Sequence, residues 1–167
     1  MTEKLYYESS HRKDFEAQVI SCEPEGEGYK VVLDKTVFFP EGGGQYADTG
    51  ILGGVHVLDV QEKDEIIYHY TDGALTPGEI VQGEIDWEKR FESMQQHSGE
   101  HIISGIVHGR FGYNNVGFHL GADYCTMDFD GPITKEQLKE IEEEANRIVY
   151  KNLNIEILYP TKEELKD

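Results

Sequence analysis

Cysteine is scarce in this sequence of 167 residues, which contains only Cys22 and Cys125. The two lie about one hundred residues apart and form neither a Cys-x-x-Cys motif nor a disulfide framework. A small secreted protein held together by disulfides is therefore excluded. Each cysteine falls in a strand-like run, and we expect both to be small, buried, apolar side chains.

Long apolar runs are also missing. No segment approaches the roughly 18 consecutive apolar residues that a membrane-spanning helix needs, and the N-terminus has no apolar stretch typical of a secretory signal. The hydrophobic content of 38% is nevertheless sufficient for a folded core. We therefore expect a soluble, cytoplasmic protein with no membrane partner.

Basic residues are few. The chain has 15 Lys and Arg residues against 33 Asp and Glu residues, which gives a formal net charge of −18. Because binding to phosphates draws mainly on Lys and Arg, this field disfavours extended contact with a nucleic acid. If the protein handles RNA, we expect it to touch only a short end, or another part of a longer protein to hold the rest.

The first half of the sequence has the pattern of short strands separated by turn residues. Many short strands with regular turns favour a small β-barrel, which we assign to a first domain, residues 1–86. The expected strands are 15–22, 29–33, 55–60, 66–70 and 80–85.

The second half has a mixed pattern, so the predicted fold class is α+β, with an N-terminal barrel and an α/β domain over residues 87–167. Asp86 is a suitable N-cap for a long helix, and Thr134 with Gln137 matches a capping box that opens a second helix running to about residue 152. The expected inward-facing positions of the first helix are Phe91, Met94, Ser98, Ile102 and Val107; those of the second are Leu138, Ile141, Ala145, Ile148 and Val149.

An antiparallel sheet is expected beside these helices, from strands at 116–120, 124–129 and 154–159. Residues from Thr161 onward have the composition of another helix, and the sequence stops about one turn into it. We therefore expect this chain to be a fragment of a longer protein.

His97 and His101 lie four residues apart in the first helix, so both side chains project from one face and can bind one zinc ion. Two ligands are too few for a complete zinc site, and the alternative is a pair of solvated or core-edge histidines. With Glu100 the run also matches the His-x-x-Glu-His pattern of inverted zinc peptidases. That function requires a carboxylate from a later helix, such as residues 142–144 or 163–164.

Three consecutive glycines at 42–44 precede Gln45. Glycine permits positive φ and close approach of the backbone to a neighbour. The run is not a phosphate-binding P-loop, because no Lys-Ser/Thr follows it.

These two motifs together are similar to a known family. Residues 34–50 resemble the glycine-rich signature of the alanyl-tRNA synthetase editing domain and of its free-standing relatives, the AlaX proteins, and residues 95–104 resemble the family's His-x-x-x-His helix. The same domain is the second additional domain of threonyl- and alanyl-tRNA synthetases. The resemblance covers almost the whole chain, and the two motifs occur in the family's order.

The resemblance implies zinc-dependent hydrolysis of mischarged aminoacyl-tRNA, typically Ser- or Gly-tRNA(Ala), with the acceptor end of the tRNA as the partner. It implies metal ligation by His97 and His101, and catalytic roles for Gln45 and Glu100. The substrate-binding residues that it implies are Thr36, Gly43, Gly44 and Gln45.

One family feature is missing. The family completes its zinc site with a downstream Cys-x-x-x-His motif, and Cys125 does not provide one because Phe129 stands where the histidine is required. We expect this half of the site, and a possible homodimer contact, to belong to a region not present here. The alternative is a non-catalytic binding module with a degenerate metal site; the inverted peptidase ranks last, since it gives no place to the glycine-rich turn.

Overall fold

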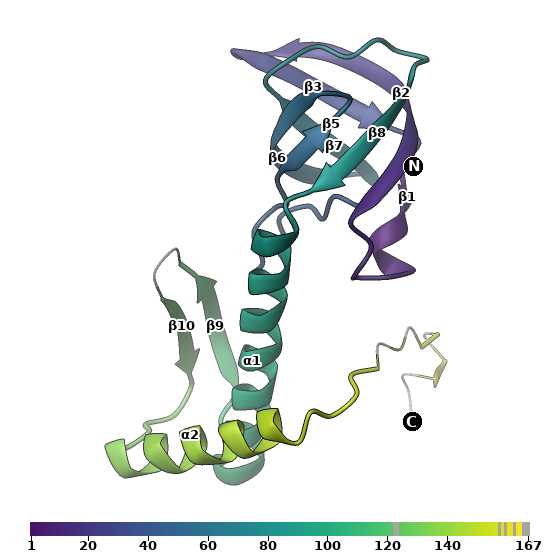
Figure 1. The fold of residues 1–167 in the computed structure, drawn as a ribbon. Coiled ribbons are helices and arrows are strands. Elements are labelled where there is room, and N and C mark those ends of the chain that lie inside the picture. The colour runs from purple at the N-terminus through teal and green to yellow at the C-terminus, as the bar shows by residue number, and fades with distance from the viewer. Residues whose placement is uncertain (122–123, 157, 159, 162, 165–167) are drawn as a thin grey trace.

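The computed structural model describes residues 1–167 apart from 122–123, 157, 159, 162 and 165–167. The chain forms short strands over its first half and two helices with a β-hairpin over its second half (Figure 1). The elements before the first helix are β1 (Glu3–Lys4), the 3-10 helix η1 (Leu5–Tyr7), β2 (Asp14–Glu25), β3 (Gly28–Leu33), β4 (Lys35–Thr36), β5 (Gly50–Leu52), β6 (Val55–Lys63), β7 (Ile66–Thr71) and β8 (Ile80–Ile85). The rest are α1 (Trp87–Phe111), β9 (Asn115–Leu120), β10 (Cys125–Phe129) and α2 (Lys135–Tyr150).

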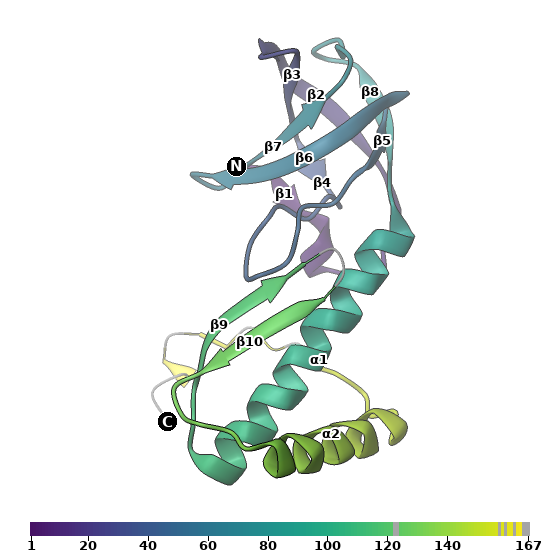
Figure 2. The ribbon, with the colours of Figure 1, turned by 90° about the vertical axis from the view of Figure 1, so that its left-hand side faces the viewer.

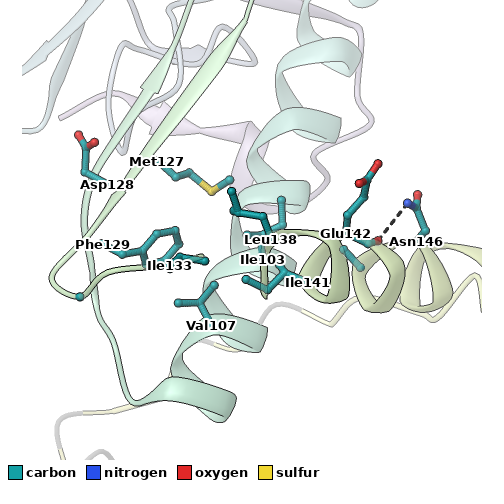
Figure 3. Close-up of a pocket in the computed structure, with 12 residues that line it drawn as sticks. Ile103, Val107, Met127, Asp128, Phe129, Ile133, Leu138, Ile141, Glu142 and Asn146 are labelled. Atoms are coloured by element: carbon teal, nitrogen blue, oxygen red, sulfur yellow. Dashed lines mark hydrogen bonds between the residues drawn. The ribbon is translucent and has the colours of Figure 1, made fainter. Parts of the chain in front are cut away.

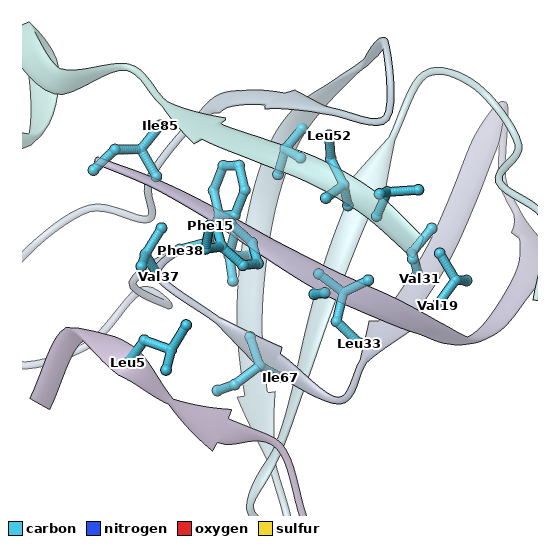
Figure 4. Close-up of a cluster of buried hydrophobic side chains, with 14 of the residues drawn as sticks. Leu5, Phe15, Val19, Val31, Leu33, Val37, Phe38, Leu52, Ile67 and Ile85 are labelled. Carbon is cyan, nitrogen blue, oxygen red and sulfur yellow. The ribbon is translucent and has the colours of Figure 1, made fainter. Parts of the chain in front are cut away.

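Six strands make an antiparallel sheet in the order β2-β3-β7-β6-β5-β8. β8 pairs with both β5 and β2, so the order returns to its start, although β5 contributes only three residues to this closure. Buried and exposed residues alternate along β2, as in a strand with one face toward a core. Phe15, Ala17 and Val19 are buried, while the residues between them are exposed. These side chains join a large cluster that fills the space enclosed by the strands (Figure 4).

The long helix α1 leaves the sheet at its first turn and extends away from it (Figure 1). The Asp86 side chain caps its start by accepting a hydrogen bond from the Lys89 backbone N–H at 3.2 Å. Gly112 ends it with a φ of 72°, a conformation that glycine adopts without strain. Both helix ends follow from the sequence.

The β9–β10 hairpin lies alongside α1, and α2 crosses the end of α1 that is farther from the sheet (Figures 1 and 2). Thr134 and Gln137 form the predicted capping box at the start of α2. A second hydrophobic cluster, around Ile106, Val107 and Ile141, joins α1 to α2. It shares no residue with the cluster inside the sheet; the division at residue 86 stays a prediction.

The prediction of a mixed α+β chain is confirmed in outline, with a six-stranded antiparallel sheet and two helices. None of the helices among the described residues is long and apolar enough to span a membrane.

Three expectations about the helices were wrong. Phe91 of α1 is 42% exposed, and Leu138 and Val149 of α2 are 53% and 60% exposed. The buried residues of α1 are Arg90, Glu100, Ile106 and Val107. Two of these are charged, which a search for an apolar stripe cannot find.

The remaining corrections concern the cysteines and the C-terminal segment. Cys22 and Cys125 are both free and only partly buried. Of the strand expected at 154–159, residues 154–156 and 158 are not in a strand, and 157 and 159 lie outside the described residues. The helix expected after Thr161 falls mostly on residues that the structure does not describe.

Candidate functional site

The middle of α1 presents the two predicted metal ligands side by side. The rings of His97 and His101 stack with their centroids 4.9 Å apart and their planes 23° from parallel. One ligand atom from each of His97, Glu100 and His101 lies within 4.8 Å of the others. The helix therefore brings together the three residues that the sequence singled out.

Gln45, from the glycine-rich turn, contacts the first of these histidines. Its side chain is buried, and its Oε1 lies 3.2 Å from Nδ1 of His97. Because an amide oxygen only accepts, Nδ1 carries the proton and donates it, which leaves Nε2 as the nitrogen for a metal. Partial burial and the nearby imidazole of His101 lower the pKa of His97, while Glu100 opposes this shift. His97 is thus held with one ring orientation and one tautomer.

Glu100 lies in a network of polar side chains next to His101. Its Oε1 accepts hydrogen bonds from Ser104 Oγ at 2.6 Å and from Asn115 Nδ2 at 2.7 Å. Its Oε2 lies 3.3 Å from Nδ1 of His101. The carboxylate is buried, whereas the His101 ring is exposed. Glu100 therefore contacts His101 and, through Asn115, ties α1 to β9.

The glycine-rich turn is closed by two backbone hydrogen bonds between Gly42 and Gln45, at 3.0 and 3.1 Å. Gly43 and Gly44 have φ values of 61° and 82°, as the two central residues of a type I′ turn require. A Cβ on Gly44 would lie 2.6 Å from Cδ1 of Phe118 in β9, and one on Gly43 would lie 3.9 Å from Cε1 of His97. The turn thus fits closely against α1 and the hairpin.

A buried ion pair anchors the segment that carries this turn. Arg90 donates from Nε to Oδ1 of Asp48 at 2.8 Å, and its second terminal nitrogen also contacts Asp48. The same guanidinium donates to the backbone oxygens of Val37 at 2.7 Å and Ser10 at 3.2 Å. The ends of the 37–48 segment are therefore fixed to α1 about two turns before His97.

Thr36 occupies a different position from the other predicted residues. It is fully buried inside the sheet, where its hydroxyl lies 2.9 Å from Nε2 of His69 and accepts a hydrogen bond from the Phe38 backbone N–H at 3.0 Å. His119 is exposed on β9, and no contact with His97 or His101 is found for it among the described residues. The structure therefore brings Gln45, Gly43 and Gly44 to the histidines, whereas Thr36 lies in β4, which pairs with β1, and is buried against His69 of β7.

Several cavities lie along α1, and His101 lines one of about 500 Å³ between α1 and α2. A groove of about 680 Å³ lies between the turn, the first half of α1 and the hairpin tip, and its lining includes Glu41, Tyr46 and Gln96. Since these residues neighbour Gln45 and His97 in the chain, the groove borders the candidate site. A second pocket, of about 780 Å³, lies between α1, β10 and α2, where Ile103, Val107 and Ile141 converge (Figure 3). None of the predicted site residues lines it.

Comparison with known proteins identifies the family. The family model described as tRNA synthetases class II (A) matches residues 2–89. The alanyl-tRNA editing protein Aarsd1 of Rattus norvegicus is 35% identical in an alignment that covers 92% of this chain and 40% of that protein. This chain belongs to the alanyl-tRNA synthetase editing-domain family.

Other relatives agree. The alanyl-tRNA editing protein AlaX-L of Pyrococcus horikoshii is 32% identical, over 94% of this chain and 41% of that protein. An alanine–tRNA ligase of Halobacterium salinarum is 39% identical, over 98% of this chain and 19% of the ligase. The chain thus spans about two fifths of the length of its editing-protein relatives.

Several residues that build this candidate site were missed by sequence reasoning. Asp48, Arg90, Asn115 and Phe118 position the turn, the helix and the hairpin against each other. Only Ser104 carried a local signal, because it follows Glu100 by four residues on one helix. The others depend on contacts between segments 15 to 74 residues apart, which no local pattern reveals.

Proposed function

We propose that this chain is the ester-hydrolysing part of an aminoacyl-tRNA deacylase that removes serine or glycine from mischarged tRNA(Ala). The hydrogen bond between His97 and Gln45 carries this proposal, because it joins the two family motifs into one site.

The donor set fits zinc in part. His97 and His101 offer Nε2 from two nearly parallel rings, and each Nδ1 faces an oxygen of Gln45 or Glu100. This is the usual arrangement around a metal-bound imidazole, in which an outer oxygen fixes the ring and its tautomer. Zinc needs further ligands, and Glu100 is already engaged by Ser104 and Asn115. We propose that a segment outside this chain supplies them, as the family's downstream motif would.

The chemistry required is modest. Water adds to the carbonyl carbon of the aminoacyl ester, the bond to the ribose oxygen breaks, and the products are the free amino acid and an uncharged tRNA hydroxyl. Bound zinc would supply a Lewis acid or a water of lowered pKa next to that carbonyl.

The residues of this chain position the reactants. Gln45 and Glu100 contact the two imidazoles, and Gly43 lies in the turn close to the His97 ring. We propose that both polar residues are positioning residues; a direct role of Glu100 as general base stays a prediction. The Thr36 hydroxyl already contacts His69 and accepts a hydrogen bond from the Phe38 backbone. In this proposal, Thr36 can form a hydrogen bond with the hydroxyl of a bound serine only if one of these contacts breaks.

The second candidate is a non-catalytic binding module, which the incomplete donor set favours. The inverted peptidase gains no support, because no α2 carboxylate joins the histidine cluster among the residues that the structure describes. Homodimerisation and a cytoplasmic location stay predictions.

Hydrolysis assays test the proposal. Ser-, Gly- and Ala-tRNA(Ala) are incubated with a longer form of the protein and with this chain, and the zinc content of each is measured. We expect the longer form to deacylate Ser- or Gly-tRNA(Ala) and to spare Ala-tRNA(Ala), and its His97→Ala variant to lose the activity. An inactive longer form that contains stoichiometric zinc would overturn the proposal, while persistently substoichiometric zinc would favour the binding module.

A further inference from the structure

The start of α1 carries a cluster of rings that the histidine site does not use. Trp87 and Phe91 stack with their centroids 5.6 Å apart and their planes 28° from parallel. The His11 ring lies 5.6 Å from the Trp87 ring, and Lys13 Nζ lies 4.7 Å from the centre of the Trp87 ring. We call these four residues, His11, Lys13, Trp87 and Phe91, the Trp87 cluster.

Only the inner side of the Trp87 cluster packs against the rest of the protein. Trp87 is partly buried against the hydrophobic cluster inside the strands, which accounts for its inner face. Phe91 is 42% exposed, and His11 and Lys13 are exposed as well. A solvent-facing aromatic ring, stacked on a tryptophan that also holds a cation, is available to a ligand with a flat face.

The charge at this place differs from that of the whole chain. Residues 11–13 are His-Arg-Lys, the only three consecutive residues in the sequence that can all carry positive charge, whereas the net charge is −18. This positive charge is small, because Arg12 pairs with Glu8 at 3.5 Å and Asp14 directly follows Lys13. A polyanion can therefore touch the protein here with one or two phosphates, and the rest of its affinity must come from stacking.

We propose that the Trp87 cluster stacks an unpaired nucleobase of the single-stranded 3′ end of tRNA, with Lys13 close to the neighbouring phosphate. The proposal rests on the deacylase function above and adds the place where the RNA is held. Stacking on aromatic rings tolerates any base, because every base has a π-face. It therefore suits a single-stranded end held near a site that reads the amino acid.

The position along α1 fits this occupant. Phe91 precedes His97 by six residues, about 9 Å along the helix axis and about 120° around it, and precedes His101 by ten residues, about 15 Å along and about 80° around. These axial lengths correspond to roughly three to four stacked bases at about 3.4 Å each. An ester at the histidines and a base on Phe91 can thus belong to one short RNA strand.

Tryptophan fluorescence tests the proposal without any hydrolysis. Trp87 is the only tryptophan of the chain, so its emission reports on the cluster alone. The chain is titrated at low ionic strength, in metal-free buffer, with an uncharged RNA stem-loop that ends in a single-stranded 3′ extension. We expect saturable quenching of Trp87, and much weaker binding of the same stem-loop with a blunt end.

Variants then separate stacking from charge, with binding followed by the anisotropy of labelled RNA. Phe91→Ala is expected to weaken binding roughly 5- to 100-fold, as loss of one base–aromatic stack does. Lys13→Gln should reduce the salt slope of log K by about 1. The matched control is Ile80→Ala, which trims a similarly exposed apolar side chain on β8 and should leave affinity unchanged.

The outcomes are distinct from those of the deacylase assay. Equal affinity of Phe91→Ala and the unaltered chain, unquenched Trp87 emission, or equal binding of the blunt stem-loop would each overturn the inference and assign the cluster to packing alone. None of these results depends on zinc or on turnover. Quenching that requires the 3′ extension would support RNA binding by the cluster even if the longer protein failed to hydrolyse the ester.

Discussion

Arg90 and Asp48 form a buried ion pair that connects the long helix to the segment carrying the glycine-rich turn. Each side chain is only 3% exposed, and each makes further hydrogen bonds to the backbone of that segment or its neighbours. The pair fixes where the turn lies relative to α1. It therefore determines whether Gln45 can reach His97.

Asp48→Asn should strongly destabilise the protein. The substitution keeps the shape of the side chain but leaves the Arg90 guanidinium buried without a counter-charge, which typically costs about 3–5 kcal/mol. Urea unfolding followed by circular dichroism measures the loss. The control is Glu62→Gln, which removes the more exposed ion pair with Lys4 and should cost no more than about 1 kcal/mol. Equal losses in the two variants would contradict an anchoring role for Asp48.

Gly44→Ala is expected to disturb the turn in two ways. Its φ of 82° is unfavourable for alanine, by about 1–2 kcal/mol, and the added methyl group would lie 2.6 Å from the Phe118 ring. Gly54→Ala separates these effects, because its φ is 88° and no atom lies within 4 Å of the added carbon. Thermal and urea unfolding should show the larger loss for Gly44→Ala.

A double variant completes this test. Gly44→Ala made in a Phe118→Ala background no longer meets the ring, so relative to Phe118→Ala alone it should cost only about as much as Gly54→Ala. If Gly44→Ala and Gly54→Ala cost the same, close packing of the turn against β9 is not what requires glycine there.

Local patterns predicted the parts of the structure that local physics determines. Asp86, Gly112 and the Thr134–Gln137 box terminate helices through contacts within one turn, and the four-residue spacing of His97 and His101 gives one face of any helix. The contact between Gln45 and His97 joins residues 52 positions apart. Only the family resemblance placed them near each other.

The errors have a physical cause as well. A hydrophobicity pattern assigns apolar residues to the interior, so it placed Phe91 inside and overlooked Arg90 and Glu100. Charged side chains are buried when they are paired or hydrogen-bonded, and those partners lie on other elements of this fold. Motifs in the sequence had already named Gln45 and Glu100, but Asp48, Arg90 and Asn115, which position the turn, the helix and the hairpin, were hidden from it.

Zinc binding by this chain should depend on Gln45 as well as on the histidines. His97→Ala and His101→Ala each remove a proposed ligand, and Gln45→Ala frees the His97 ring, which should weaken zinc binding by roughly 10- to 100-fold. Isothermal titration with zinc, supported by elemental analysis, gives the affinities. His108→Ala is the matched control, since this exposed histidine lies on the same helix outside the cluster. A loss of zinc in the His108→Ala variant, or none in His97→Ala, would remove the proposed site.

The buried histidine behind Thr36 should make stability depend on pH. Burial lowers the pKa of His69 from 6.5 to about 4. The His69 side chain of the unfolded chain is therefore protonated below pH 6.5, whereas that of the folded chain is protonated only below about pH 4. The free energy of unfolding therefore falls as pH drops through this window, by roughly 3 kcal/mol in total from this group, and is unaffected above it.

Urea unfolding at a series of pH values between 7 and 4 measures this effect. His69→Gln should lower stability at pH 7, because the imidazole's hydrogen bonds to Thr36 and to the Val31 carbonyl are lost. It should also flatten the pH dependence by the equivalent of one proton, because glutamine does not titrate. His56→Gln is the control, since His56 is exposed and pairs with Asp72 at the surface, and the steep dependence should persist there. Parallel pH curves for the unaltered chain and His69→Gln would show that His69 is not the group responsible.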